Sequence, residues 1–174
     1  MNNSELLNSH FSAGSQISFR QLANGLVMAE VDTPLTTATV SLYGGHIVSW
    51  RPKQHVEPVL WLSKLAQFRQ GKAIRGGVPI CWPWFGAHLS QSSLPSHGYA
   101  RISNWELTCL QTLTNGAIEL TLLLVKSDSS EVSWNTDVQL TLKLTIGEIL
   151  QIDLTTLNQS DQSVTFTEGL HTYF

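Results

Sequence analysis

Apolar and polar residues alternate with a period of two over much of the chain, a pattern that is typical of strands with one buried face. The pattern is clearest in "VQLTLKLTI" (138–146) and "EILQIDLTTL" (148–157). One side carries Leu140, Leu142, Leu144 and Ile146 in the first segment, and Leu150, Ile152 and Leu154 in the second. A short connection at Gly147-Glu148 separates the two segments. They therefore predict an antiparallel hairpin.

Pairs of residues that end in glycine separate other alternating segments and predict more hairpins. Asn-Gly is the pair that best tolerates the positive φ angles of a type I′ turn. We expect such turns at Asn115-Gly116 and Asn24-Gly25, and a further turn at Gly44-Gly45. Only residues 59–68 could form a helical turn, so we predict an all-β, antiparallel sandwich rather than a small barrel, in one domain covering residues 1–174.

Residues 71–101 interrupt the alternation. This segment, "GKAIRGGVPICWPWFGAHLSQSSLPSHGYAR", is rich in Gly and Pro and contains no strand of useful length. A connection of about thirty residues without secondary structure is uncommon inside a compact domain and is usually functional. We therefore expect the functional site to include this loop.

Composition excludes several classes of partner. The net charge is −3 and the chain has only 10 Lys and Arg, so it lacks the basic patch that binds nucleic acid or an anionic membrane. The segment 1–14 lacks the basic and apolar regions typical of a signal peptide, no apolar run is long enough to span a bilayer, and Cys81 and Cys109 are far apart without a metal-binding pattern. We expect a cytoplasmic protein without a metal; motifs for phosphate-binding loops and nucleophilic serines are also absent.

Arg75 is the first candidate for ligand binding. It precedes Gly76-Gly77, where missing side chains would let a ligand approach, and its guanidinium could hold a phosphate or sugar hydroxyls. It could equally be a loop arginine that bonds backbone carbonyls. The nearby Trp82 and Phe85 could stack on a sugar ring or pack in the core.

His97, Arg101 and His171 are the other candidates. In an extended chain, His97 and Arg101 would lie on the same side, where they and Arg75 could face one anionic group. Alternatively, His97 could hold a backbone carbonyl at a loop end. His171 in "EGLHTYF" could donate a proton near neutral pH, or be a structural histidine anchored by Leu170 and the aromatic residues that follow.

Several segments together resemble a known family. They are "GGHIVSWRP", "VLWLS", "IRGGVPICWPWFG", "HGYARISNWEL" and "EGLHTYF", in this order from about residue 40 to the end. The chain is similar to the glucose-6-phosphate 1-epimerases, relatives of the aldose 1-epimerases. The resemblance implies a β-sandwich of the galactose-mutarotase type and the interconversion of α and β anomers of a hexose 6-phosphate, without a cofactor.

The resemblance also implies residue roles. His171 corresponds to the catalytic histidine that protonates the ring oxygen, Arg75 and Arg101 to arginines that hold the phosphate, and His97 to a substrate-binding neighbour. Family members continue well past this histidine and supply a general base as a glutamate near their C-terminus. We therefore expect a chain that is truncated within its domain, and we assign the base to no residue.

Three functional readings remain open. The first is a hexose-6-phosphate 1-epimerase represented by its N-terminal part. The second is a non-catalytic module that binds sugar phosphates, and the third is an aldose 1-epimerase acting on unphosphorylated sugars. A truncated sandwich would also leave sheet edges unpaired, so we expect possible self-association along those edges.

Overall fold

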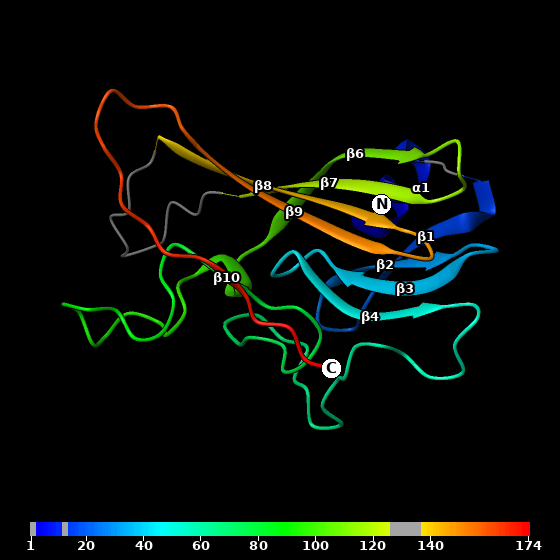
Figure 1. Cartoon of the computed structure of the whole chain (residues 1–174), viewed down its shortest axis with the longest axis horizontal. Coiled ribbons are helices and arrows are strands. Elements are labelled where there is room, and N and C mark those ends of the chain that lie inside the picture. The colour runs from blue at the N-terminus through cyan, green and yellow to red at the C-terminus, as the bar shows by residue number, and fades with distance from the viewer. Residues whose placement is uncertain (1–2, 12–13, 126–136) are drawn as a thin grey trace.

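The computed structural model describes residues 3–11, 14–125 and 137–174 (Figure 1). Two four-stranded antiparallel sheets form its main layers, and each contains its strands in sequence order. The first sheet consists of β1 (Ile17–Gln21), β2 (Val27–Asp32), β3 (Thr36–Ser41) and β4 (His46–Pro52). The second consists of β6 (Trp105–Thr112), β7 (Ile118–Leu124), β8 (Val138–Ile146) and β9 (Leu150–Asn158). The predicted all-β antiparallel fold is confirmed.

The core lies between the two sheets. Val40 and Ile47 of the first sheet belong to the same buried apolar cluster as Leu120 and Leu142 of the second. In β8, burial alternates as the sequence predicts, and every inward residue is at most 4% exposed. Strand β9 is an edge, and its apolar residues are only partly covered.

A two-stranded sheet lies outside these layers. It pairs β5 (Ile80–Cys81) with β10 (Gly169–Leu170), near the C-terminus (Figure 1). Apart from β5 and the 3₁₀ helix η2 (Ala100–Ile102), residues 71–101 contain no helix or strand. This agrees with the prediction of a long irregular loop.

The predicted hairpins form, but the Asn-Gly turns are not of type I′. Type I′ requires positive φ at both central residues, whereas only the glycine has it, at 83° for Gly116 and 89° for Gly25. Asn115 and Asn24 instead accept a hydrogen bond through their side-chain oxygens from the amide two residues later. The side chain therefore stabilises a turn of five residues in place of a tighter one.

The helical expectation was also wrong. Residues 59–68 contain no helix, while α1 (Asn3–His10) and the 3₁₀ helix η1 (Gly14–Gln16) precede β1. The side chain of Asn8 in α1 bonds both the N–H and the carbonyl of Phe19 on β1. Tertiary hydrogen bonds of this kind stabilise a short helix that local sequence does not indicate. None of the described helices is long and apolar enough to cross a membrane.

Leu142→Ala should destabilise the sandwich strongly. The side chain is fully buried between the sheets, so its truncation removes apolar burial and leaves a cavity costing about 2–5 kcal/mol. Leu89→Ala, the same change at a fully exposed position, should cost about 0.5 kcal/mol or less. Urea unfolding measures both free energies, and similar values would contradict the assigned core.

Candidate active site

The carbonyl group of Trp82 joins the two arms of the long loop. It accepts hydrogen bonds from the amides of Tyr99 and Ala100, at 3.0 and 3.2 Å. Gly98 lies so close to this carbonyl that a β-carbon at residue 98 would overlap it. The contact therefore requires glycine, and it places the segments around Phe85 and His97 side by side.

His171 reaches the same place from the C-terminal segment. It directly follows β10, and its amide donates a 3.0 Å hydrogen bond to the carbonyl of Pro79 beside β5. Its ring centroid lies 5.8 Å from that of His97, 6.2 Å from that of Phe85 and 5.0 Å from that of Tyr173. We call these four rings the aromatic cluster; it brings together three predicted site residues.

The hydrogen bonds of His97 determine its tautomer. Its φ is 64°, and its backbone N–H donates to the carbonyl of Gly86 at 2.6 Å. The amide of Gly86 in turn donates to Nδ1 of His97 at 3.2 Å. Because Nδ1 accepts, the proton of the neutral imidazole is on Nε2. Burial lowers the pKa of His97, and the charges of Arg101 and His171 lower it further.

Arg101 approaches His97 through a geometry that the sequence did not predict. The segment is not extended, because Arg101 lies in η2 and His97 has a left-handed backbone. One guanidinium nitrogen, Nη2, donates to the carbonyl of Ser96 at 2.7 Å. The buried Nε has no hydrogen-bond partner among the described residues. The charge of Arg101 contributes to the lowered pKa of His97, after burial.

Arg75 lies in the first part of the long loop, before β5. Its backbone carbonyl accepts from the amide of Ser63 at 3.1 Å, and the next residue, Gly76, pairs with Leu62. The side chain is exposed and makes no hydrogen bond or ion pair with other described residues. The turn that carries Arg75 meets the aromatic cluster through the backbone, because the amide of Tyr173 donates to the carbonyl of Gly77 at 2.9 Å.

The two aromatic candidates, Phe85 and Trp82, differ in their exposure to solvent. Phe85 is 53% exposed and contacts both histidines, so its ring remains available. Trp82 is only 1% exposed, and its Nε1 donates to the hydroxyl of Thr156 on β9. A ring that is buried in this way has no free face for a sugar, which corrects the predicted role of Trp82. Phe174, expected to anchor His171, is exposed.

Trp61 was missed by the sequence analysis. Its amide donates to the carbonyl of Tyr173 at 3.0 Å, and its ring lies 5.9 Å from that of Tyr173. The indole is 47% exposed beside the aromatic cluster. Trp61 lies in "VLWLS", one of the segments that carry the family resemblance, but its pairing with Tyr173, more than a hundred residues away, cannot be read from that segment.

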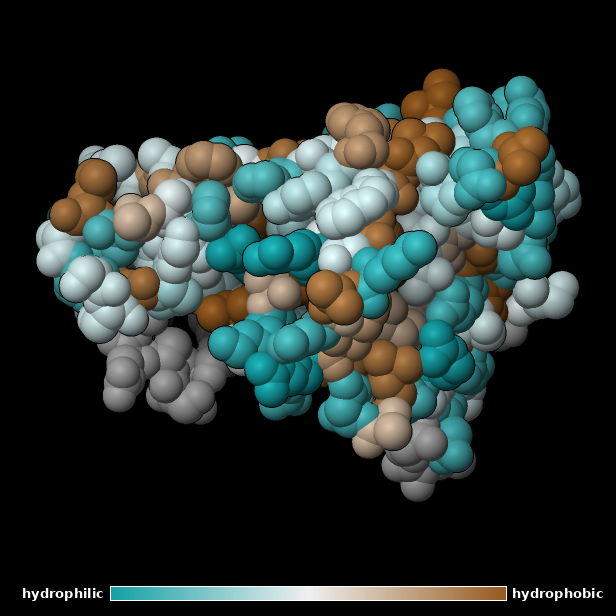
Figure 2. All heavy atoms as spheres, turned by 90° about the horizontal axis from the view of Figure 1, so that it is seen from below, coloured by the Kyte–Doolittle hydropathy of each residue, from teal (hydrophilic) through white to brown (hydrophobic). Residues whose placement is uncertain are grey.

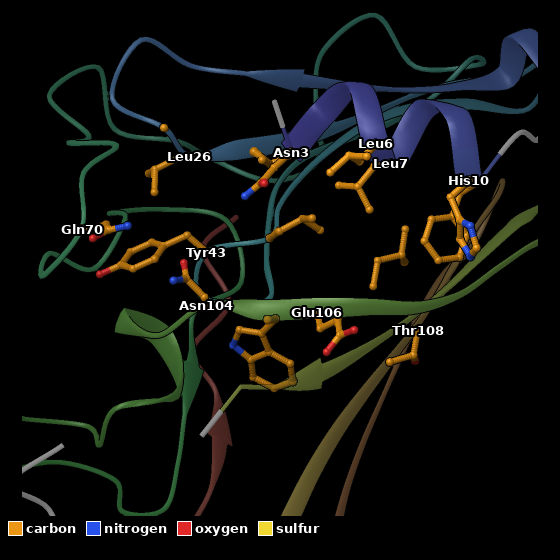
Figure 3. A pocket seen from close by; sticks show the side chains of 16 residues that line it. Asn3, Leu6, Leu7, His10, Leu26, Tyr43, Gln70, Asn104, Glu106 and Thr108 are labelled. Atoms are coloured by element: carbon orange, nitrogen blue, oxygen red, sulfur yellow. The ribbon is translucent and has the colours of Figure 1, made fainter. Parts of the chain in front are cut away.

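A separate groove of about 720 Å³ lies between α1 and β6 (Figure 3). Leu6, Leu7 and His10 of α1 face Glu106 and Thr108 of β6 across it. None of the predicted site residues lines this groove. The long loop, not this groove, therefore carries the candidate active site.

Comparison with known proteins identifies the family. The sequence profile of the aldose 1-epimerases matches residues 28–174. The chain belongs to the aldose 1-epimerase family. As a member, it has the β-rich sandwich expected from the resemblance to mutarotases.

Individual relatives agree with this membership. An Escherichia coli K12 protein with the provisional name glucose-6-phosphate 1-epimerase is 39% identical over 92% of this chain and 52% of its own. A Salmonella typhimurium protein of the same name is 40% identical over 91% of this chain and 51% of its own. A crystal structure from Salmonella typhimurium, provisionally described as a mutarotase, matches with a TM-score of 0.77 and 38% identity over 84% of this chain and 48% of its own. This epimerase-family chain thus spans about half the length of the curated relatives it matches.

The candidate active site of this family member contains no metal-binding group among residues 3–11, 14–125 and 137–174. It combines two histidines, exposed aromatic surface and a nearby arginine. Such a set can transfer protons, stack on an apolar sugar face and bind an anion.

Arg101→Ala should raise the pKa of His97. Burial is the main cause of the depressed value, and the cation of Arg101 is the next, so removing this charge favours the imidazolium. NMR titration of the His97 ring measures the change. Arg51→Ala, which removes a guanidinium that bonds the carbonyl of His55, is the control and should have no effect. An unchanged or lower pKa of His97 in Arg101→Ala would contradict the electrostatic geometry.

Proposed function

We propose that this chain carries the sugar-phosphate binding half of a hexose-6-phosphate 1-epimerase, with glucose 6-phosphate as the favoured ligand and the cytoplasm as its compartment. The contact between His97, His171 and Phe85 is the observation that supports the proposal most directly. The names of the relatives add glucose 6-phosphate as the substrate to test.

In the proposed reaction, His171 donates a proton to the ring oxygen of the sugar. A base removes the proton of the C1 hydroxyl as the bond between C1 and the ring oxygen breaks, which gives the open-chain aldehyde. Rotation about C1–C2 and closure, with both proton transfers reversed, produce the other anomer. General acid–base groups suffice for this reaction.

The electrostatics of the histidine pair support this division of roles. A charge on His171 lowers the pKa of His97, so protonation of both rings at once is disfavoured. His97 remains neutral with its proton on Nε2, which can donate a hydrogen bond to a sugar oxygen. The transferable proton is then assigned to His171.

The phosphate is assigned to the two arginines. A guanidinium binds phosphate oxygens with charge-assisted hydrogen bonds, and Arg75 has all its donors available among the described residues. Arg101 retains donors beyond the one bound to Ser96. Phosphate binding remote from C1 would orient the sugar ring against His171.

The general base is assigned to no residue of this chain. Glu168 precedes β10 and is exposed, and Glu148 lies in the turn before β9, far from His171 in the sequence. The isolated chain should therefore bind the ligand and exchange anomers poorly. Rapid anomer exchange by the chain alone, measured by polarimetry, would contradict this assignment.

Replacing both Arg75 and Arg101 by Ala should remove the preference for phosphorylated sugar. Each charge-assisted contact contributes roughly tenfold in affinity, so binding of glucose 6-phosphate should weaken about a hundredfold while binding of glucose stays unchanged. Calorimetric titration with the two sugars measures the difference. Replacement of Arg20 and Arg51, which lie on β1 and β4, is the matched control.

This titration separates the two readings that bind a sugar phosphate from the reading that acts on free sugars. Equal affinities for glucose and glucose 6-phosphate in the unmodified chain would favour an aldose 1-epimerase that acts on free sugars. No measurable binding of either sugar would contradict the proposed function altogether.

Self-association is proposed as a property of the edge strand β9. Ile152 and Leu154 on this strand are only partly covered, and Leu157 is exposed. On the face seen from below, Figure 2 shows apolar side chains interspersed with polar ones. An unpaired apolar edge favours pairing with another chain.

Sedimentation velocity should therefore show a concentration-dependent dimer or larger species. Leu157→Lys places a charge at the edge and should shift the distribution toward monomer. Leu89→Lys, at an exposed position outside any strand, is the control. A monomer at all concentrations would contradict the proposed edge pairing.

A further inference from the structure

His46 is the buried ionisable side chain that the proposed reaction leaves without a role. It is 0% exposed and begins β4, directly after the Gly44-Gly45 turn. Its Nε2 lies 2.7 Å from the carbonyl oxygen of Gly76, the residue after Arg75. Because a carbonyl can only accept, Nε2 carries the proton.

The peptide group between Gly76 and Gly77 is held at both ends, because the amide of Gly77 donates a 2.7 Å hydrogen bond to the carbonyl of Trp61 and the Gly76 carbonyl meets His46. Both glycines have positive φ, at 110° and 63°, and glycine pairs can rotate their shared peptide group at little cost. Both are buried, and a β-carbon at Gly77 would lie 2.9 Å from Nε2 of His46. The ring of His46 therefore packs directly against the turn that carries Arg75.

The turn before His46 also contacts the segment that carries Arg101. The amide of Gly44 donates a 2.7 Å hydrogen bond to the carbonyl of Ser103. A β-carbon at Gly44 would lie 2.9 Å from the carbonyl oxygen of Arg101. The connection from Gly44 to His46 thus touches both backbone segments that bear the candidate phosphate ligands.

We propose that His46 is a positioning residue, whose hydrogen bond to the Gly76 carbonyl fixes the Arg75 turn relative to the Arg101 segment. Without this donor, the Gly76 carbonyl would be buried and unsatisfied, and the hydrogen bond from the Gly77 amide to Trp61 would be left to orient the peptide that follows Arg75. The role of Arg75 as a phosphate ligand rests on the proposed function. The hydrogen bond between His46 and the Gly76 carbonyl is independent of that function.

The protonation state of His46 supports this role. Burial lowers its pKa to about 4, the hydrogen bond to Gly76 opposes the shift, and the charge of Arg101 adds to it. The imidazole is therefore neutral near pH 7. Nδ1 has no hydrogen-bond partner among the described residues, so the tautomer that donates from Nε2 serves the only observed contact.

Two substitutions separate the hydrogen bond from the volume of the ring. His46→Phe fills the space without a donor, whereas His46→Gln retains an N–H near the position of Nε2. His55→Phe and His55→Gln make the same changes at an exposed histidine as controls. We expect His46→Phe to weaken glucose 6-phosphate binding about tenfold, with unchanged glucose binding, and His46→Gln to recover most of the loss.

A double-mutant cycle tests whether the effect acts through Arg75. In an Arg75→Ala background, His46→Phe should cause no further loss of glucose 6-phosphate affinity, because the positioned group is absent. An equal loss in both backgrounds would overturn the positioning role. So would an equal loss of glucose and glucose 6-phosphate binding in the single variant, since that indicates a general structural defect.

NMR of the unmodified chain tests the hydrogen bond without any ligand or variant. Long-range ¹H–¹⁵N spectra should show His46 as the Nε2–H tautomer at neutral pH. The Nδ1–H tautomer or an imidazolium would overturn the inference even if the chain binds glucose 6-phosphate. If the chain binds no sugar phosphate but shows the expected tautomer, the proposed function fails while the His46 contact stands.

Discussion

The assembled site depends on one backbone interaction, the pair of hydrogen bonds from Tyr99 and Ala100 to the carbonyl of Trp82. These bonds close the long loop onto itself, and the missing side chain of Gly98 allows the two arms to approach. Phe85 on one arm then meets His97 on the other. Without these hydrogen bonds, the two arms of the loop would separate, and its aromatic and cationic residues would no longer lie together.

The sandwich supplies the other constraint, because the loop is fixed at its borders by strands. β5 pairs with β10, which delivers His171, and Val78 pairs with Ile47 at the start of β4. The catalytic candidates therefore come from segments that are distant in sequence but meet along the edge of regular structure. Rigid support of this kind gives a binding loop a defined geometry.

The three histidines near the site differ in their surroundings. Burial lowers the pKa of both His97 and His46. Their hydrogen bonds differ, because Nδ1 of His97 accepts from an amide whereas Nε2 of His46 donates to a carbonyl. His171 makes neither contact, and its ring is held by aromatic neighbours. Three histidines in one region can thus bind, support and transfer a proton.

The sequence predicted the features that depend on local pattern. Period-two alternation predicted the strands of both sheets, and the Asn-Gly pairs marked two hairpins, although the Asn side chains changed the turn type. Helix α1 was missed because its stability depends on Asn8 and the distant β1 strand. Trp82 and Phe85 look alike in the loop sequence, and tertiary packing, including the distant contact with Thr156, places Trp82 in the core. His46 was missed because it resembles an ordinary strand residue, while its partner is thirty residues away.

A crystal structure of the chain grown with glucose 6-phosphate tests the central claim most directly. The account predicts the sugar against the aromatic cluster, with its ring oxygen within hydrogen-bond distance of the His171 imidazole and its phosphate on the guanidinium groups of Arg75 and Arg101. A sugar phosphate bound elsewhere, such as in the groove between α1 and β6, would contradict it.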